Sequence, residues 1–271
     1  MKKNTSKTII NSILWVLSIV WIFPAVFAIM GSLKNMQEYN LSNFWELPKS
    51  LGIAENWEYI TQTPGIIGGL FNSGIYALSG ALFSTIIALL AAYAIAHLKI
   101  KHRLFWFLFI YSGTIFPFQV YLVPVYVGLS SVGLYDSRLG MILFYSAICV
   151  PFSMFVLRNY FIDISKEICE SAKIDGASDL RILGNIFVPM AKAPLAVVFL
   201  SQFTWIWNDL MFGLTFTKTP EVRPIMASIS LMGKARVPAI MLVCILASIP
   251  TLLLFRFLQK HFAHGFAYQS K

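Results

Sequence analysis

The sequence predicts an all-α polytopic membrane protein with six transmembrane helices and a long polar loop between the fourth and the fifth. Three observations support this class. Of the 271 residues, 58% are hydrophobic and only 12% are charged, whereas soluble domains carry about 25% charged residues. Apolar runs of about 20 residues recur along the chain, a length that crosses a bilayer core roughly 30 Å thick. The basic residues lie mainly between these runs, where they orient membrane helices.

The expected spans belong to one transmembrane domain of residues 1–271. They cover residues 9–30, 71–96, 104–129, 139–157, 195–216 and 239–258. The first run is longer than the apolar core of a secretory signal, so we interpret it as a retained span. The third is irregular because Pro117 and Pro124 interrupt it. Prolines are tolerated in spans where neighbouring helices or water satisfy the freed carbonyl groups, so this span is expected to face a bundle interior.

The distribution of charge predicts the orientation of the chain. Six spans place both termini on the same side, and with both in the cytoplasm the inner segments hold 14 of the 21 Lys and Arg residues. This is the bias that the positive-inside rule describes. The loop of about residues 217–238 contradicts it, because it is then external but carries four basic residues. The long outer segment 31–70 is expected to form short interfacial helices, either as a solvated loop or as a place for a protein partner.

Composition also argues against several functions. The net charge of +9 comes from dispersed residues rather than from one basic patch, so membrane lipid is an expected partner and nucleic acid is not. Cys149, Cys169 and Cys244 include no C-x-x-C pair, and no histidine has an acid or a cysteine at ligand spacing. We therefore expect neither a disulfide framework nor a metal site. No grouping of catalytic residues is present in the sequence, so no catalytic residue is expected.

A small residue recurs at every fourth position of the second expected span. These positions are Gly80, Ser84, Ala88, Ala92 and Ala96. Residues four apart share one helical face. The face is therefore nearly smooth and predicts the close approach of another helix.

The segment of residues 163–189 is the most informative of the chain. Ser165 is a suitable N-cap for a helix over residues 166–174, and Asp175-Gly176 is expected to end it. Glycine suits this position because it adopts the left-handed conformation at little cost.

A second short helix is expected after this turn. Ser178 can cap it, it extends through Leu183, and Pro189 marks the return to the membrane. Two short helices with mixed charge and a narrow apolar stripe form either a docking knob or an amphipathic loop on lipid headgroups, and the residues alone leave both open.

A longer pattern lies in the same loop. E-x-A-x-x-x-G, nine residues and then I-x-x-P is filled by Glu170, Ala172, Gly176, Ile186 and Pro189. It resembles the cytoplasmic coupling-helix loop of permease subunits of binding-protein-dependent ABC importers. The core Ile174–Ser178 looks most like the carbohydrate branch, specifically the maltose-type second permease subunit. Ser171 stands where the family pattern has alanine, a small-for-small departure.

The resemblance implies a function and a set of partners. The chain would pair with a second permease subunit in the cell membrane, receive a sugar or oligosaccharide from an extracytoplasmic solute-binding protein, and dock on a cytoplasmic ATPase dimer. The implied ATPase-coupling residues are Glu170, Ser171, Ala172, Asp175, Gly176, Ala177, Ser178 and Pro189. The chain has no G-x-x-x-x-G-K-[ST] loop. It is therefore expected to bind no cofactor and to be no enzyme, with ATP and Mg on the partner subunits.

A second group of residues is expected at the translocation path or at a subunit interface. Asp209 is the only acid inside an expected span, and such a charge costs about 2.5–3.5 kcal/mol at mid-membrane on insertion scales. It either faces a polar cavity or pairs with a neighbouring helix for structure alone. Trp205 and Trp207 either stack on sugar rings or belong to the interfacial aromatic belt.

The remaining members of this group are polar or helix-breaking. Asn208 either binds hydroxyl groups or bridges helices. Trp207-Asn208-Asp209 resembles the Trp-Asn-acid signature of the family's fifth span, and Pro117 with Gln119 resembles its third. The alternative function is an ion-coupled secondary transporter. That class needs intramembrane ionisable groups, for which Asp209 alone gives little support.

Overall fold

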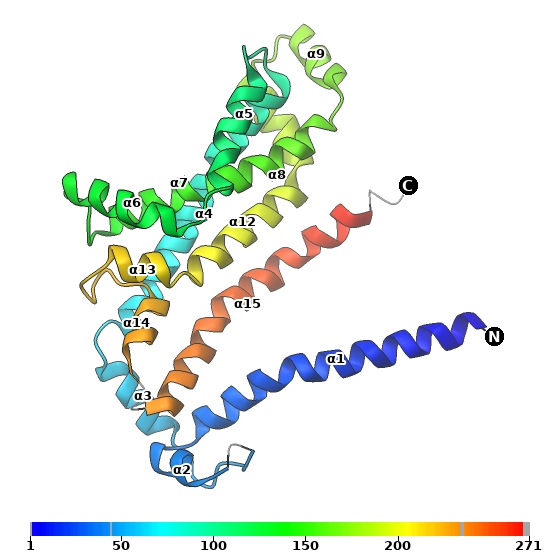
Figure 1. Ribbon diagram of the computed structural model, residues 1–271. Coiled ribbons are helices and arrows are strands. Elements are labelled where there is room, and N and C mark those ends of the chain that lie inside the picture. Colours follow the sequence, from blue (N-terminus) through cyan, green and yellow to red (C-terminus); the bar gives the residue numbers. More distant parts are fainter. Residues whose placement is uncertain (1, 44, 234–235, 268–271) are drawn as a thin grey trace. The chain divides into compact units, whose positions relative to one another are not determined.

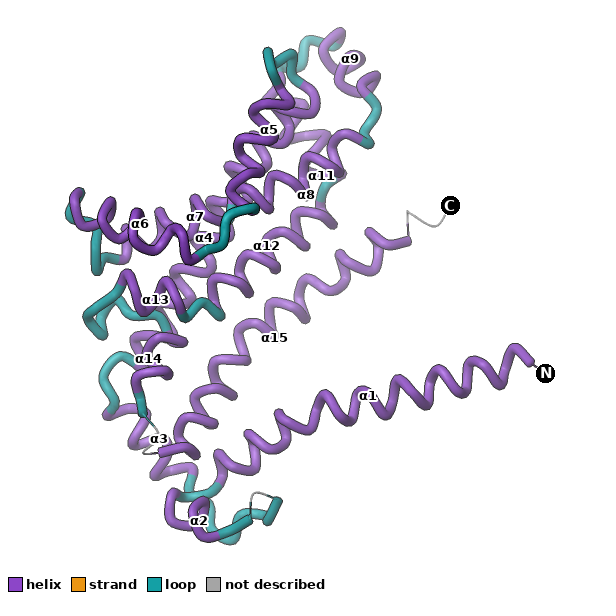
Figure 2. The backbone as a smooth tube through the Cα atoms, viewed as in Figure 1, coloured by secondary structure: helices purple, strands orange, loops and turns teal. Residues whose placement is uncertain are grey.

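The computed structural model describes residues 2–43, 45–233 and 236–267, and these residues form helices without any strand (Figure 2). Contacts divide the chain into two compact units. The first consists of Met1–Ile67 with Ile229–Ile249, and the second of Gly68–Ser228 with Pro250–Lys271.

Four helical segments are long and apolar enough to cross a bilayer. They are Lys7–Leu33, Ile66–His97, Arg138–Ile162 and Val237–Gln259. Two further helix pairs meet the same criteria jointly but are bent, Arg103–Thr114 with Gln119–Ser131 by 97° and Asp179–Met190 with Lys192–Trp207 by 82°. The described residues thus hold four spans, or six if each bent pair counts as one, which confirms the all-helical membrane class.

The first unit contains the N-terminal helix and the long segment after it. Its elements in Figure 1 are α1 (Lys2–Leu33), α2 (Met36–Leu41), α3 (Ile53–Gln62) and the first part of α15 (Val237–Ala267). Lys34 is buried, and its Nζ donates to Ser42 Oγ at 2.8 Å and to the Asn43 carbonyl at 3.0 Å. The expected short helices in this segment are therefore present, and the buried Lys34 side chain joins the end of α1 to the end of α2 through two hydrogen bonds.

The second unit holds most of the remaining helices. They are α4 (Ile66–His97), α5 (Arg103–Tyr111), α6 (Gln119–Ser131), α7 (Arg138–Ile148), α8 (Val150–Ile162), α9 (Lys166–Ile174), α10 (Asp179–Ile182), α11 (Val188–Met190), α12 (Lys192–Trp207), α13 (Met211–Phe216) and α14 (Ile225–Leu231). A short 3-10 helix, η1 (Ser112–Thr114), follows α5, and a short π-helix, η2 (Leu183–Phe187), joins α10 to α11. Helix α4 begins in the first unit, and helix α14 ends in it.

The smooth face of α4 packs as the four-residue spacing predicts. Ser84, Ala88 and Ala92 are fully buried. A Cβ added to Gly80 would stand 2.7 Å from Ile206 Cδ1 of α12 and 3.0 Å from Tyr145 Cβ of α7. Only glycine therefore permits this helix contact without a shift of its neighbours.

The expected third span is not one straight helix. Its two halves, α5 and α6, meet at 97° around residues 115–118, whereas Pro124 lies inside α6. Pro117 explains the break, because proline has no N–H group and disfavours helical geometry in the preceding residue. The Tyr121 hydroxyl donates to the Gly113 carbonyl at 3.1 Å, so one carbonyl freed at the break is satisfied within the chain.

The expected fifth span, residues 195–216, is also interrupted. Helix α12 ends at Trp207, and α13 begins at Met211 after a break at residues 208–210. The Asn208 amide donates to the Thr204 carbonyl at 2.8 Å, and the Asp209 carboxylate accepts from the N–H of Gly213 at 2.9 Å. Short polar side chains that bond nearby backbone groups favour helix ends over helix interiors.

Candidate functional site

The first helix of the polar loop is closed at both ends by local hydrogen bonds. Ser165 Oγ accepts the N–H of Glu167 at 3.3 Å, so Ser165 is the N-cap of α9. At the other end, the N–H of Gly176 donates to the Lys173 carbonyl and the N–H of Ala177 to the Ala172 carbonyl, both at 3.0 Å. These two bonds define a Schellman motif. Gly176 occupies its left-handed position with φ of 79°.

The second helix starts directly after this turn. Ser178 Oγ accepts the N–H of Arg181 at 3.4 Å and caps α10. Lys173 Nζ lies 2.8 Å from Asp179 Oδ1, which joins α9 to α10 across the turn. The hydrogen bond to Asp179 raises the pKa of Lys173. The predicted pair of capped helices is therefore present, although η2 continues the second one to Phe187.

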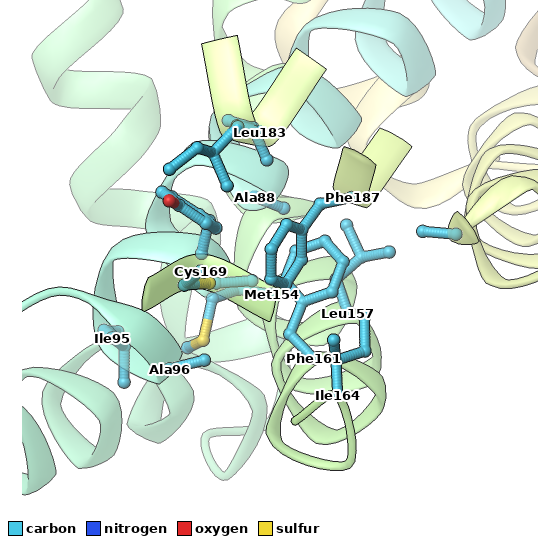
Figure 3. Packing of buried hydrophobic residues seen from close by; sticks show 14 of the residues in the cluster. Ala88, Ile95, Ala96, Met154, Leu157, Phe161, Ile164, Cys169, Leu183 and Phe187 are labelled. Carbon is cyan, nitrogen blue, oxygen red and sulfur yellow. The ribbon is translucent and has the colours of Figure 1, made fainter. Parts of the chain in front are cut away.

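The inner face of α9 is anchored in the core of the second unit. Cys169 of α9 and Ile164, which precedes this helix, lie among buried residues of α4, α8 and η2, including Met154, Phe161 and Phe187 (Figure 3). Burial raises the pKa of the Cys169 thiol. This packing fixes the base of the loop to three other elements.

His97 of α4 adds polar contacts to this anchor. Its Nε2 lies 2.7 Å from the Phe161 carbonyl and its Nδ1 lies 3.6 Å from Cys169 Sγ. If the Phe161 carbonyl accepts the Nε2–H, Nδ1 is the acceptor for the thiol. One imidazole then connects α4, α8 and α9.

The outer face of the loop carries most of the expected coupling residues. Ala172 and Ala177 are half-buried, and Pro189 lies apart from the turn in α11. The exposed residues are Glu170, Ser171, Asp175, Gly176 and Ser178. Two apolar side chains that we did not single out for contact are also exposed, Ile174 by 87% and Leu180 by 74%. Ile174 lies outside the apolar spacing of Ile164, Ile168 and Ala172, and this is the signal in the sequence that could have identified it.

The break between α12 and α13 borders an open cavity of about 750 Å³. The lining residues are Phe118, Leu200, Ser201, Thr204, Trp205, Asn208, Asp209, Leu210, Met211 and Phe212. Trp205 is half-buried, with its ring centroid 5.3 Å from that of Phe118. The cavity thus combines aromatic surface with hydroxyl, amide and carboxylate groups.

The other residues expected at a path occupy different environments. Trp207 is only 3% exposed and stacks on Phe203 at 5.7 Å. The expectation that its ring stacks on a sugar does not fit this burial, since α12 turns the ring into the core. Pro117 and Gln119 are exposed next to Phe118 but do not line the cavity.

Asp209 has a structural role at the cavity wall. Its carboxylate accepts the Tyr145 hydroxyl at 2.8 Å and the N–H groups of Gly213 at 2.9 Å and Phe212 at 3.4 Å. These bonds start α13 and tie it to α7. Among the described residues, no group of three or more His, Cys, Asp or Glu side chains could hold a metal ion.

Comparison with known proteins decides the family. Residues 84–268 match the family model described as binding-protein-dependent transport system inner membrane component. The chain belongs to this family. The matched residues include the capped loop α9–α10 and the break at Asn208-Asp209, so both features lie inside the region that defines family membership.

Curated relatives of this permease chain cover most of its length. It is 35% identical over 215 residues to a probable ABC transporter permease protein of Pyrococcus horikoshii, covering 78% of this chain and 77% of the relative. It is 31% identical over 204 residues to the permease protein of a diacetylchitobiose uptake system of Streptomyces coelicolor, covering 73% of this chain and 65% of the relative.

A solved structure shares the fold of this permease. A chain of a bacterial ABC transporter involved in the import of the acidic polysaccharide alginate aligns with a TM-score of 0.82 and 21% identity, covering 97% of this chain and 98% of that one. This similarity extends the shared architecture to nearly the whole chain.

Proposed function

We propose that the chain is the transmembrane permease subunit of an ATP-driven, solute-binding-protein-dependent importer and that the loop α9–α10 couples it to a cytoplasmic ATPase. The observation that carries this proposal is the rigid construction of that loop. Its base is anchored to α4 and α8 through His97 and Cys169, and its outer face presents Ile174 and Leu180 to solvent. Exposed apolar side chains on a rigid support are typical of a docking surface.

In the proposed assembly, this chain works with three other kinds of subunit. A second permease subunit completes the path, a pair of ATPase subunits binds ATP and Mg, and an extracytoplasmic solute-binding protein delivers the cargo. The capped loop must face the ATPase. This requires both chain termini to be cytoplasmic, as the excess of Lys and Arg in the inner segments also favours.

The proposed cargo is a sugar or an oligosaccharide. The relative from Streptomyces coelicolor is named for diacetylchitobiose uptake. In this chain the cavity beside α12 offers the Trp205 ring, the Asn208 amide and the hydroxyl groups of Ser201 and Thr204. Aromatic faces suit the apolar face of a sugar ring, and the polar groups suit its hydroxyls.

The Asp209 contacts argue against ion-coupled transport. Its carboxylate already accepts hydrogen bonds from Tyr145 and from two backbone N–H groups. We therefore assign Asp209 to the architecture of the path and leave direct cargo contact to its neighbours.

The decisive experiment changes the turn between α9 and α10. Apart from its chain neighbours, no atom lies within 4 Å of a Cβ added to Gly176. The main effect of Gly176→Val is therefore on the left-handed backbone, which costs about 1–2 kcal/mol for a residue with a Cβ. We expect the assembled complex to form in proteoliposomes and its solute-stimulated ATP hydrolysis to fall to the unstimulated rate. Gly176→Asn is the matched control, because asparagine tolerates this conformation. Normal stimulation in the valine variant would refute the coupling role.

A further inference from the structure

A second cavity lies at the foot of the loop, away from the one beside α12. It has a volume of about 370 Å³ and is bounded by the end of α4, the start of α5, the end of α8 and the start of α9. Ile95, Ala96, Leu104 and Ile162 supply apolar wall. Arg103, Arg158 and Lys166 line the same cavity, together with His97.

The charge of this cavity is uncompensated. No carboxylate is among its lining residues. Within the described part of the chain, the ion pairs are Lys173–Asp179 and Arg236–Glu55, and neither involves Arg103, Arg158 or Lys166. Three cations around one partly apolar cavity repel one another, so an anion that enters it is attracted by all three.

Arg158 carries an independent sign of a missing ligand. Its Nη1 donates to Asn159 Oδ1 at 3.2 Å, and its guanidinium carbon lies 4.4 Å from the Phe107 ring centroid. Its Nε, in contrast, is buried and has no hydrogen-bond partner in the described structure. Buried donors without a partner are rare in proteins and indicate an absent water, ion or ligand.

The start of α5 adds further donors at the same place. This nine-residue helix begins at Arg103, and its N-cap residue, His102, makes no side-chain capping hydrogen bond. The N–H groups of an uncapped first turn and the positive end of the helix dipole favour an anion. The three cations of the cavity, the buried donor of Arg158 and the start of α5 thus all indicate that the ligand is negatively charged.

We propose that this cavity is a binding site for the phosphate group of an anionic phospholipid. Arginine matches the geometry of phosphate oxygens. The cavity lies where the spans Ile66–His97 and Arg138–Ile162 end and where Arg103–Thr114 begins. Span ends are the level of lipid headgroups, and basic pockets between helices on the cytoplasmic side bind such groups. The apolar wall suits the glycerol and the first acyl carbons.

This site has a consequence that rests on the proposed coupling function. Lys166 is the first residue of α9, and His97 contacts both Cys169 of α9 and the end of α8. A phosphate held by Arg103, Arg158 and Lys166 therefore fixes the foot of the coupling loop to α5 and α8. The lipid acts as a structural part of the support for the ATPase contact.

Binding is tested by photolabelling of the assembled complex in phosphatidylcholine nanodiscs that contain a photoactivatable phosphatidylglycerol. We expect labelled peptides from residues 103–111 and 158–166 and about tenfold less labelling in Arg158→Gln and Arg103→Gln. Lys101→Gln is the control, because Lys101 is exposed and does not line the cavity. Arg103 is exposed as well, so its variant reports on the site even if Arg158→Gln fails to fold.

Further arms identify the source of the phosphate. Loss of labelling on addition of millimolar inorganic phosphate would assign the site to a soluble phosphate and overturn the lipid. Equal labelling by a photoactivatable phosphatidylcholine, or equal loss in Lys101→Gln, would overturn the anionic site. None of these arms measures ATP hydrolysis, so they stand if the coupling role fails. If the coupling role holds, phosphatidylglycerol should also increase solute-stimulated ATP hydrolysis in the unmodified complex but not in Arg103→Gln.

Discussion

The Tyr145 hydroxyl donates a 2.8 Å hydrogen bond to Asp209 Oδ2 and so connects the middle of α7 to the break after α12. Tyr145 is fully buried, and the carboxylate also accepts the N–H groups that start α13. The wall of the larger cavity therefore depends on one carboxylate that satisfies three donors from two elements.

Substitution of either partner tests this arrangement. Asp209→Ala leaves a buried hydroxyl and two N–H groups without an acceptor, and we expect it to lower the stability of the complex by about 1–3 kcal/mol. Tyr145→Phe removes one hydrogen bond and leaves the carboxylate its backbone donors, so about 1 kcal/mol is expected. Thermal unfolding of the assembled complex in detergent measures both. A larger loss in Tyr145→Phe than in Asp209→Ala would contradict this ranking.

The sequence predicts those parts of the structure that depend on neighbouring residues. Ser165, Gly176 and Ser178 cap or end helices through bonds that reach five residues or fewer, so their residue types are sufficient. The four-residue spacing on α4 likewise predicts a buried face because a helix has a fixed period. Pro117 indicates that the third span is interrupted, although it gives no value for the bend.

Contacts between distant residues escape this reasoning. Asp209 stands out as an acid in an apolar run, but Tyr145 is 64 positions away and nothing local marks it as the partner. Trp205 and Trp207 are equivalent in the sequence, yet only Trp205 lines the cavity. The position of each residue on α12 directs the Trp205 ring to the cavity and the Trp207 ring into the core. The cluster of Arg103, Arg158 and Lys166 also comes from three separate helices.

The glycines of α4 provide a matched pair for testing close packing. Gly80→Ala places a Cβ 3.0 Å from Tyr145 Cβ and 2.7 Å from Ile206 Cδ1, whereas nothing lies within 4 Å of a Cβ at Gly74. Overpacking costs about 1–3 kcal/mol, and replacing a helical glycine by alanine gains about 1 kcal/mol. We expect Gly74→Ala to raise or maintain the unfolding temperature and Gly80→Ala to lower it. The same change in both variants would show that α4 tolerates a wider separation from α7 and α12.

The exposed apolar residues of the coupling loop provide a test of docking. Burial of each side chain contributes about 1.5–3 kcal/mol, so Ile174→Ser and Leu180→Ser should each weaken the affinity for the ATPase about tenfold or more. The measurement is binding of purified ATPase to the permease pair in nanodiscs. Val132→Ser is the control, since Val132 is 66% exposed at the far end of α6. Unchanged affinity in both loop variants would place the contact elsewhere on the loop.

Glu38 predicts a dependence on pH in the first unit. Its carboxylate accepts the N–H of Lys49 at 2.6 Å and the N–H and hydroxyl of Ser50 at 3.3 and 2.9 Å, and so ties α2 to the segment before α3. The Lys49 hydrogen bond is the main cause that lowers the pKa of Glu38. A carboxylate with a lowered pKa stabilises the folded segment above its unfolded pKa and loses that contribution as pH falls through the folded value. Protection of the Lys49 and Ser50 amides should therefore stay constant from neutral pH down to the ordinary glutamate value of 4.5 and decrease below it.

Amide hydrogen exchange, corrected for the intrinsic dependence of the exchange rate on pH, measures this protection. Glu38→Gln removes the titrating charge, so its protection at these amides should be low at every pH. Glu58→Gln is the matched control, because Glu58 accepts from the Gln62 side chain at 3.0 Å and its carboxylate accepts no backbone N–H in the described structure. A decrease in the unmodified chain between pH 7 and 5 would assign the transition to another group. Retained protection in Glu38→Gln would show that backbone packing alone orders the segment.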